Sequence, residues 1–370
     1  MNSTPKLVVL ALGLAALVAA CEEEVTVEPP DPVEQIQYAR SYVLADNGLP
    51  NNEVTSFLVL GNGELWIGTH AGVARYPNIG AEQSTDIVTE VSGLPHPQVR
   101  DMAEHNGKVY VGTWGGGIGI YDVAGDVWSQ IRPAPTGLTD GFIGSVASSP
   151  TEDRVYLASN NGVFIYNPVD ETFTHFSTID DGIPPTSADG QMQAIVSTLA
   201  VQEDAGVVQR WYAPRVEVRL PADRRMLHGI TVSTAATTFK YTTTNSGLVE
   251  PNVNDVYYDA QDGSFWVAYV SKGISRVNVA QKTWVHYDLV DGLLSNTVLA
   301  ITRAKDNDPT SNDTVIWAAT QNGLAKLVNN RWQSYAVANG LPSSRLRSVF
   351  SDDGVRLWAG FVDAGAVRIH

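Results

Sequence analysis

The chain has 370 residues, and its 40 acidic side chains outnumber its 24 basic ones, which gives a formal net charge of −16. A surface of this charge repels a polyanionic backbone, and no basic stripe interrupts it, so the sequence excludes nucleic acid as a partner. Cys21 is the one cysteine. No disulfide can therefore form within the chain, and a hydrophobic core must supply its stability.

Residues 1–20 have the pattern of a signal peptide. Lys6 precedes an uninterrupted apolar run from Leu7 to Val18, which is too short to span a bilayer as a stable helix. The run leads into Val18-Ala19-Ala20-Cys21, which resembles the lipobox of bacterial lipoproteins. This resemblance implies that cleavage makes Cys21 the first residue of the mature chain and that Cys21 carries acyl chains. An ordinary secretory signal is the alternative.

Residues 21–34 are acidic and rich in proline, with almost no large apolar side chains. A segment of this composition cannot bury enough apolar surface to fold, so it is predicted to be an extended, solvated tether. With a lipid at Cys21, it would hold the rest of the chain at a membrane of the bacterial cell envelope, at the outer membrane or facing the periplasm.

The remainder, residues 35–370, is built from one repeated unit. A Gly-Leu-Pro turn, or a close variant, recurs with spacings of 45, 44, 45, 65, 45 and 48 residues. The glycines of these turns are Gly48, Gly93, Gly137, Gly182, Gly247, Gly292 and Gly340. A period of this length is typical of the blades of a β-propeller, and seven units fill the chain.

Each unit contains the pattern of four short strands. The second strand has the clearest signature, as in Leu65–Thr69 (Leu-Trp-Ile-Gly-Thr) and Leu357–Gly360 (Leu-Trp-Ala-Gly), and paired aromatics mark the fourth strand. Such β-branched and aromatic residues between glycine-containing turns favour strands, and no sustained helical periodicity occurs. The predicted fold class is all-β, a seven-bladed β-propeller with four antiparallel strands per blade.

The last unit ends after its third strand, at Val367-Arg368-Ile369-His370. The segment Gln37–Tyr42 precedes the first Gly-Leu-Pro as each fourth strand precedes the next turn. It is therefore predicted to complete the last blade, which would close the ring and remove its open edge.

The repeat resembles a known family at Leu65 to Tyr76, where Leu-Trp-Ile-Gly-Thr-x-x-Gly-Val-x-x-Tyr follows Gly-Leu-Pro. This pattern is similar to the two-component-regulator propeller repeat. The resemblance implies a periplasmic ligand-binding sensor domain, of the kind found in front of a membrane helix and a histidine kinase. Because the chain shows neither of these, we expect a stand-alone lipoprotein that does not signal in cis.

The candidate binding site is the mouth of the central channel. In a propeller the first strands line the channel, and the Gly-Leu-Pro connections and the turns between second and third strands surround its mouth. The first strands supply Arg100, Asp101, Asn254, Asp255 and Arg347, and the loops supply His70, His96 and Trp114. These side chains could bind a small polar ligand such as a sugar or a carboxylate, although a wet channel needs a polar lining in any case.

The same architecture is compatible with three further functions. His70 or His96 could act as a general base in a lyase, but spacing places no carboxylate beside them. An envelope protein could bind in place of a small ligand, or the propeller could be a structural scaffold of the envelope. We expect a monomer without cofactor, catalytic residue or metal.

Two further segments are ambiguous. Residues 306–313 superficially resemble a calcium loop but lack the glycine and distal glutamate of an EF-hand. The long fourth unit carries Arg210-Trp211-Tyr212 and further arginines up to Arg225, which could form an anion or partner site or a solvated hairpin.

Overall fold

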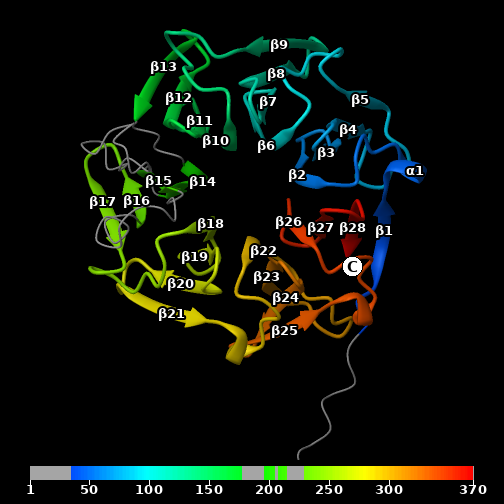
Figure 1. The fold of residues 1–370 in the computed structure, drawn as a ribbon, viewed down its shortest axis with the longest axis vertical. Helices are drawn as coiled ribbons and strands as arrows, with labels where there is room; N and C mark the ends of the chain where they lie inside the picture. The colour runs from blue at the N-terminus through cyan, green and yellow to red at the C-terminus, as the bar shows by residue number, and fades with distance from the viewer. Residues whose placement is uncertain (1–34, 177–195, 205–206, 215–228, 370) are drawn as a thin grey trace, which may run out of the picture. The chain divides into compact units, whose positions relative to one another are not determined.

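The computed structural model describes residues 35–176, 196–204, 207–214 and 229–369. Within these residues the strands form seven sheets, each with four antiparallel strands, arranged as blades around a central axis (Figure 1). The all-β, seven-bladed propeller predicted from the repeat is confirmed. In the described part of the chain, no helix has the length and apolar character that crossing a membrane requires.

The first four blades follow one another in chain order. Blade 1 has β2 (Val54–Val59), β3 (Leu65–Thr69), β4 (Gly72–Tyr76) and β5 (Asp86–Val88), and blade 2 has β6 (Val99–His105), β7 (Lys108–Thr113), β8 (Ile118–Asp122) and β9 (Val127–Ile131). Blade 3 has β10 (Ile143–Ser149), β11 (Arg154–Ser159), β12 (Gly162–Asn167) and β13 (Thr172–Phe176), and blade 4 has β14 (Val196–Asp204), β15 (Val207–Pro214), β16 (Gly229–Ser233) and β17 (Thr238–Thr242).

The last three blades contain the remaining strands. Blade 5 has β18 (Val253–Asp259), β19 (Ser264–Tyr269), β20 (Ile274–Asn278) and β21 (Thr283–Tyr287), and blade 6 has β22 (Val298–Lys305), β23 (Thr314–Thr320), β24 (Gly323–Val328) and β25 (Arg331–Tyr335). Blade 7 has β26 (Leu346–Phe350), β27 (Leu357–Phe361), β28 (Ala366–Ile369) and β1 (Tyr38–Tyr42). Short helical turns occur at α1 (Leu44–Asn47), η1 (Leu289–Asp291) and η2 (Val337–Asn339).

The N-terminal strand closes the ring, as predicted. β1 pairs antiparallel with β28, with Ser41 opposite Val367 and Tyr42 opposite Ala366. The side chain of Tyr42 is fully buried and makes an edge contact with Tyr76 of blade 1. β1 thus joins the first and last blades by backbone pairing and by packing.

The hydrophobic core is divided among the interfaces between blades. Seven clusters of buried side chains occur in the described residues, and each one joins two neighbouring blades. The tryptophans of the second strands lie in these clusters, and Trp66, Trp266, Trp317 and Trp358 are essentially inaccessible to solvent. Their role is packing, which explains why the repeat requires them.

A cation from the third strand covers the second-strand tryptophan in four blades. The guanidinium of Arg75 lies 5.0 Å from the ring centre of Trp66, and the ammonium of Lys326 lies 6.0 Å from that of Trp317. In each pair the two residues are directly opposite across the ladder, and Trp266–Arg276 and Trp358–Arg368 repeat the arrangement. Each cation covers the face of its ring, where the negative electrostatic potential of the π-system attracts it.

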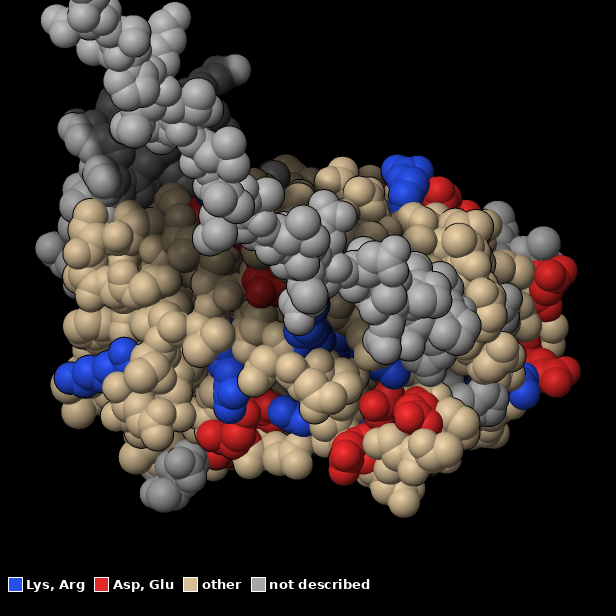
Figure 2. Space-filling view, turned by 90° about the horizontal axis from the view of Figure 1, so that it is seen from below, with Lys and Arg blue, Asp and Glu red and all other residues tan. Residues whose placement is uncertain are grey.

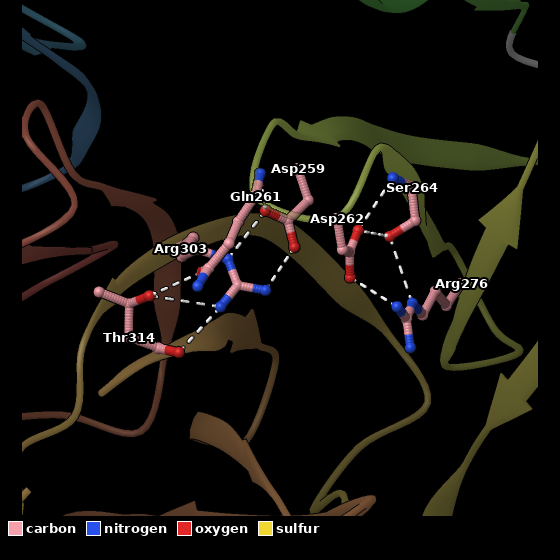
Figure 3. Close-up of polar contacts among 7 residues, drawn as sticks. All are labelled: Asp259, Gln261, Asp262, Ser264, Arg276, Arg303 and Thr314. Carbon is pink, nitrogen blue, oxygen red and sulfur yellow. Dashed lines mark hydrogen bonds and ion pairs between the residues drawn. The ribbon is translucent and has the colours of Figure 1, made fainter.

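Polar contacts on the face away from the channel mouth also join neighbouring blades. Arg303 of blade 6 forms a two-pronged ion pair with Asp259 of blade 5 and donates to the carbonyl of Thr314, whose hydroxyl donates to Gln261 (Figure 3). Asp259 is almost completely buried. The pair therefore fixes the register of two blades in a region where apolar packing ends.

Candidate functional site

The candidate site is a cavity of about 310 Å³ on the propeller axis, lined by the innermost strands of all seven blades. Every one of these strands contains a β-bulge near its start, shown by a register shift that inserts one extra residue into the strand. The extra residues are Thr55, Arg100, Gly144, Ser197, Asn254, Leu299 and Arg347, and all of them line the cavity. A bulge turns a side chain out of the ladder, so the repeated bulges build a ring of side chains at the mouth.

We refer to these seven bulged residues as the bulge ring. It is polar on most blades, but Leu299 makes it apolar on blade 6, and Phe350 and Phe57 contribute aromatic surface to the neighbouring wall. The cavity is therefore amphipathic. Of the predicted site residues, Arg100, Asn254 and Arg347 belong to the bulge ring.

Asp101 and Asp255 each come one residue after a member of the bulge ring, and their carboxyl groups accept hydrogen bonds from neighbouring blades. Asp101 accepts hydrogen bonds from the hydroxyl of Ser145 and the backbone N–H of Val146 in blade 3. Asp255 accepts from the backbone N–H of Ile301 in blade 6. Both carboxyls line the cavity, and burial raises the pKa of each to about 6.

His70 lies at the mouth between a carboxylate and a guanidinium. Its Nδ1 is 2.9 Å from Oε2 of Glu53, and its Nε2 is 3.3 Å from Nη1 of Arg100. Because a guanidinium can only donate, Nε2 is the acceptor, and the ring proton lies on Nδ1 and faces Glu53. The spacing of residues in the sequence did not identify a carboxylate partner for His70. In the structure this partner is Glu53, in the loop before β2.

Burial favours the neutral form of His70. Burial lowers the pKa of His70, and the nearby guanidinium groups of Arg100 and Arg347 lower it further, although Glu53 opposes them. Arg100 comes from blade 2 and Arg347 from blade 7, on either side of the blade that carries His70. Two cationic groups thus lie near one neutral imidazole at the mouth.

Trp114 holds Arg100 in place. The guanidinium carbon of Arg100 lies 4.4 Å from the ring centre of Trp114, and Phe142 packs edge-on against the same ring at 5.2 Å. Trp114 lines the cavity, as predicted. Stacking of this kind fixes the plane of the guanidinium and so aims its N–H groups.

The remaining predicted residues have separate positions. Nδ2 of Asn254 donates to the carbonyl of Val298 in blade 6 at 2.7 Å, so this side chain joins blades as well as lining the cavity. Nδ1 of His96 accepts from the backbone N–H of Gln98, and His96 is not among the residues of the cavity lining. Six of the eight predicted binding residues therefore line the cavity, whereas His70 and His96 are not among its lining residues. His70 nevertheless contacts Arg100 of the lining.

The segment that resembles a calcium loop binds a lysine of the same chain. The ammonium of Lys326 lies 2.7 Å from Oδ1 of Asp306 and 2.7 Å from Oδ1 of Asn307, and Lys326 and Asp306 are both buried. The ammonium group takes the oxygen ligands that a metal ion would need. In the described part of the chain, no group of three or more His, Cys, Asp and Glu side chains could hold a metal ion.

The arginines of the long fourth unit are only partly described. Arg210 and Trp211 lie in β15, where Arg210 pairs with Glu152 of blade 3 and Trp211 is fully buried. Trp211 therefore occupies the second-strand tryptophan position of blade 4, which the sequence pattern did not assign to it. Residues 215–225, with the remaining arginines, lie outside the described residues.

Comparisons with known proteins agree with the repeat and the fold. A family model described as "Two component regulator propeller" matches residues 48–71. No curated protein matches the chain. Residues 48–71 contain the first Gly-Leu-Pro turn and the Leu-Trp-Ile-Gly-Thr strand on which the predicted resemblance rests.

Several solved structures share the fold at low identity. The extracellular domain of the putative hybrid two component system BT3049 from B. thetaiotaomicron is 18% identical over 91% of this chain and 42% of that chain, with a TM-score of 0.65. PorZ, a surface component of the type-IX secretion system of Porphyromonas gingivalis, is 16% identical over 89% of this chain and 48% of that one, with a TM-score of 0.62. This chain therefore spans less than half the length of either.

A third similar structure matches over nearly its whole length. Virginiamycin B lyase from Staphylococcus aureus is 15% identical over 86% of this chain and 94% of that chain, with a TM-score of 0.58. At such identities the similarity concerns the fold alone. Taken with the family match, it shows that the chain is a seven-bladed propeller that carries the two component regulator propeller repeat.

Proposed function

We propose that this propeller binds a small, negatively charged polar ligand, such as a carboxylate-bearing sugar, at the mouth of its channel. The observation that carries the proposal is that two arginines of the bulge ring, Arg100 and Arg347, line the same cavity, and that the guanidinium of Arg100 also contacts His70. A planar guanidinium held by stacking on Trp114 suits recognition of a carboxylate.

The amphipathic lining adds a preference for the rest of the ligand. Asn254 and Ser197 provide polar groups on blades 4 and 5, whereas Leu299 and Phe350 provide apolar surface on blades 6 and 7. Ligand sites commonly combine a few directed polar groups with apolar walls. A ligand with a carboxylate at one end and a less polar ring fits this division.

We also propose that the chain acts outside the cytoplasm as a lipid-anchored, sensor-like binding protein. The lipobox-like Val18-Ala19-Ala20-Cys21 supports the anchor, and the repeat family supports the sensor-like role. The fold shared with an extracellular domain of a two component system supports the location. An envelope protein remains the alternative partner.

A thermal-shift screen of the purified protein tests the binding proposal. Each acidic probe should be paired with its neutral counterpart, for example glucuronate with glucose and galacturonate with galactose. Binding at the arginine pair predicts that melting temperature rises only with acidic probes, because binding to the native state stabilises it. Equal responses to the acidic and neutral sugars, or a response to neither, would contradict recognition of a carboxylate.

A lyase-type activity is the second candidate, because the structure adds a carboxylate to His70. Glu53 orients the imidazole and the lowered pKa keeps it in the neutral, proton-accepting form. If the protein eliminates a leaving group from a uronate, the product has a C=C bond conjugated with the carboxylate, and its absorbance in the far ultraviolet should rise. Loss of this signal in Glu53→Gln, with ligand binding retained, would favour the enzyme over the binding protein.

A further inference from the structure

Exposed aliphatic side chains gather on one side of the rim around the channel mouth. Val290 is 83% exposed, Val337 is 56% exposed, Leu289 is 53% exposed and Leu294 is 43% exposed. They lie on the connection between blades 5 and 6 and on the connection between blades 6 and 7. We call these four residues the apolar rim.

The connection between blades 5 and 6 packs against β25, the strand that leads into the connection between blades 6 and 7. The hydroxyl of Ser334, near the end of β25, donates to the carbonyl of Gly292 at 2.8 Å. A Cβ placed on Gly323 would meet both the carbonyl oxygen of Tyr335 and Cδ1 of Leu294. Leu294 is therefore close to the end of β25, two residues before Val337, so the two connections that carry the apolar rim are neighbours.

The apolar rim lies where the chain enters the propeller from its N-terminal side. The backbone N–H of Ile36 donates to the carbonyl of Asn339 in η2 at 2.8 Å, and the side-chain amide of Gln35 donates to the carbonyl of Ala338 at 3.2 Å. β1, which follows, lies beside η2 in Figure 1. The 14 residues from Cys21 to Glu34 precede this point, and they can span at most about 50 Å when fully extended.

The carboxylates of η1, within the rim, are engaged with the backbone. The side chain of Asp288 accepts from the N–H of Val290, and the side chain of Asp291 accepts from the N–H of Asp288. This capping box holds Leu289 and Val290 outward while it satisfies both acids locally. Charged side chains of both signs are interspersed on the edge of the propeller seen in Figure 2, without a continuous basic patch.

We propose that the apolar rim rests on the surface of the lipid bilayer to which Cys21 anchors the chain. This inference rests on the lipid anchor of the proposed function, and it adds an orientation to it. The acyl chains on Cys21 and an apolar contact of the rim would together hold the propeller on the bilayer more firmly than either one alone.

Contact through this rim orients the channel mouth. The rim occupies the side of blades 5 to 7, whereas His70 and Trp114 belong to blades 1 and 2 across the mouth. A propeller that rests on this side is tilted, so the side of the mouth that carries His70 and Trp114 is turned away from the membrane.

The single cysteine makes the proposal testable with one label per molecule. Val290→Cys and Val337→Cys place a thiol on the rim, and Val169→Cys is the matched control. Val169 is 78% exposed on the turn between β12 and β13, on the opposite face from the connections. Each lipidated protein is labelled with an environment-sensitive fluorophore, such as an NBD group, and inserted into phosphatidylcholine vesicles.

The rim contact predicts that emission from positions 290 and 337 shifts to shorter wavelength on vesicles and that spin-labelled lipid quenches it, whereas position 169 changes in neither respect. The absence of a shift at both rim positions in vesicle-bound protein overturns the proposal. A shift at the rim that grows with protein concentration without vesicles also overturns it, because a second copy then covers the rim.

The unsubstituted chain tests the anchor separately: labelling of Cys21 would show that it is unacylated, so that the anchor and the rim contact are both wrong. Calorimetric binding of an acidic sugar is unaffected by either result.

Discussion

At the residue scale, Asp101 and Asp255 couple the stability of the channel wall to pH. Burial raises the pKa of each to about 6 from an ordinary value of 3.8. A raised carboxyl pKa means that the unfolded chain releases its proton first, so stability falls as pH rises from about 4 to about 6. A shift of this size corresponds to about 3 kcal/mol for each group.

Asp101→Asn should remove part of this dependence. The variant should be destabilised relative to the parent at pH 4, because an NH₂ group replaces one of two oxygens that both accept from a backbone N–H, of Met102 and of Val146. This difference in stability should shrink or reverse as the pH rises from 4 to 7, because the parent then loses stability when its buried Asp101 carboxyl ionises, and the variant does not. Melting temperatures of both proteins at pH 4, 5, 6 and 7 measure this. A difference that stays constant over the range would show that Asp101 titrates normally.

The residues of the mouth show what a sequence pattern can and cannot place. Arg100, Asn254 and Arg347 are assignable to the channel because they occupy one position of a repeated strand, and the bulge ring contains all three. Glu53 could not be assigned to the mouth in this way. Its contact with His70 joins two loops, and the repeat period does not predict contacts between loops. A carboxylate just before an inner strand is the only available signal.

At the element scale, the small residue near the end of each second strand sets how closely the next blade approaches. A Cβ on Gly112 would lie 2.8 Å from methyl carbons of Ile143 and Val146 in blade 3. Gly112→Ala should therefore cost about 1–3 kcal/mol of unfolding free energy through overpacking. Gly61→Ala is the control, because nothing lies within 4 Å of its Cβ. Urea unfolding that gives equal midpoints for the two variants would contradict close packing at this interface.

The N-terminal strand is the element on which closure depends. Deleting residues 35–45 removes β1, exposes the edge of β28 and takes Tyr42 out of the interface with blade 1. This deletion should lower the melting temperature clearly, because core aromatic truncations alone cost about 3–5 kcal/mol. Deleting residues 22–32 should leave the melting temperature unchanged. If both deletions melt alike, closure does not contribute to stability.

The elements themselves are predictable because each one recurs. Because the turn and the aromatic second strand recur in the seven units, the pattern is clearer than in any single segment, so blade number, strand order and closure follow from the sequence. The fourth blade is the exception. Its extra length displaces Trp211 from the expected spacing, although Trp211 lies in β15 at the same position as the tryptophans of the second strands.

At the scale of the whole molecule, the lipid anchor makes its own prediction. Cys21→Ser should abolish incorporation of a palmitate analogue during metabolic labelling, because no second cysteine exists to accept acyl chains. The variant should also move from the membrane fraction to the soluble fraction. Labelling of the variant as strong as that of the parent would disprove the lipoprotein assignment.

Recognition of an anion by the arginine pair is tested most directly by calorimetric titration of an acidic sugar into the parent, Arg347→Ala and Arg345→Ala. Arg347 belongs to the bulge ring, whereas Arg345 is an exposed neighbour whose side chain pairs with Asp363. Loss of a charge-assisted hydrogen bond predicts that Arg347→Ala weakens binding by about 1.5–3 kcal/mol and that Arg345→Ala leaves it unchanged. Equal affinity of all three proteins for the acidic sugar would contradict binding at the channel mouth.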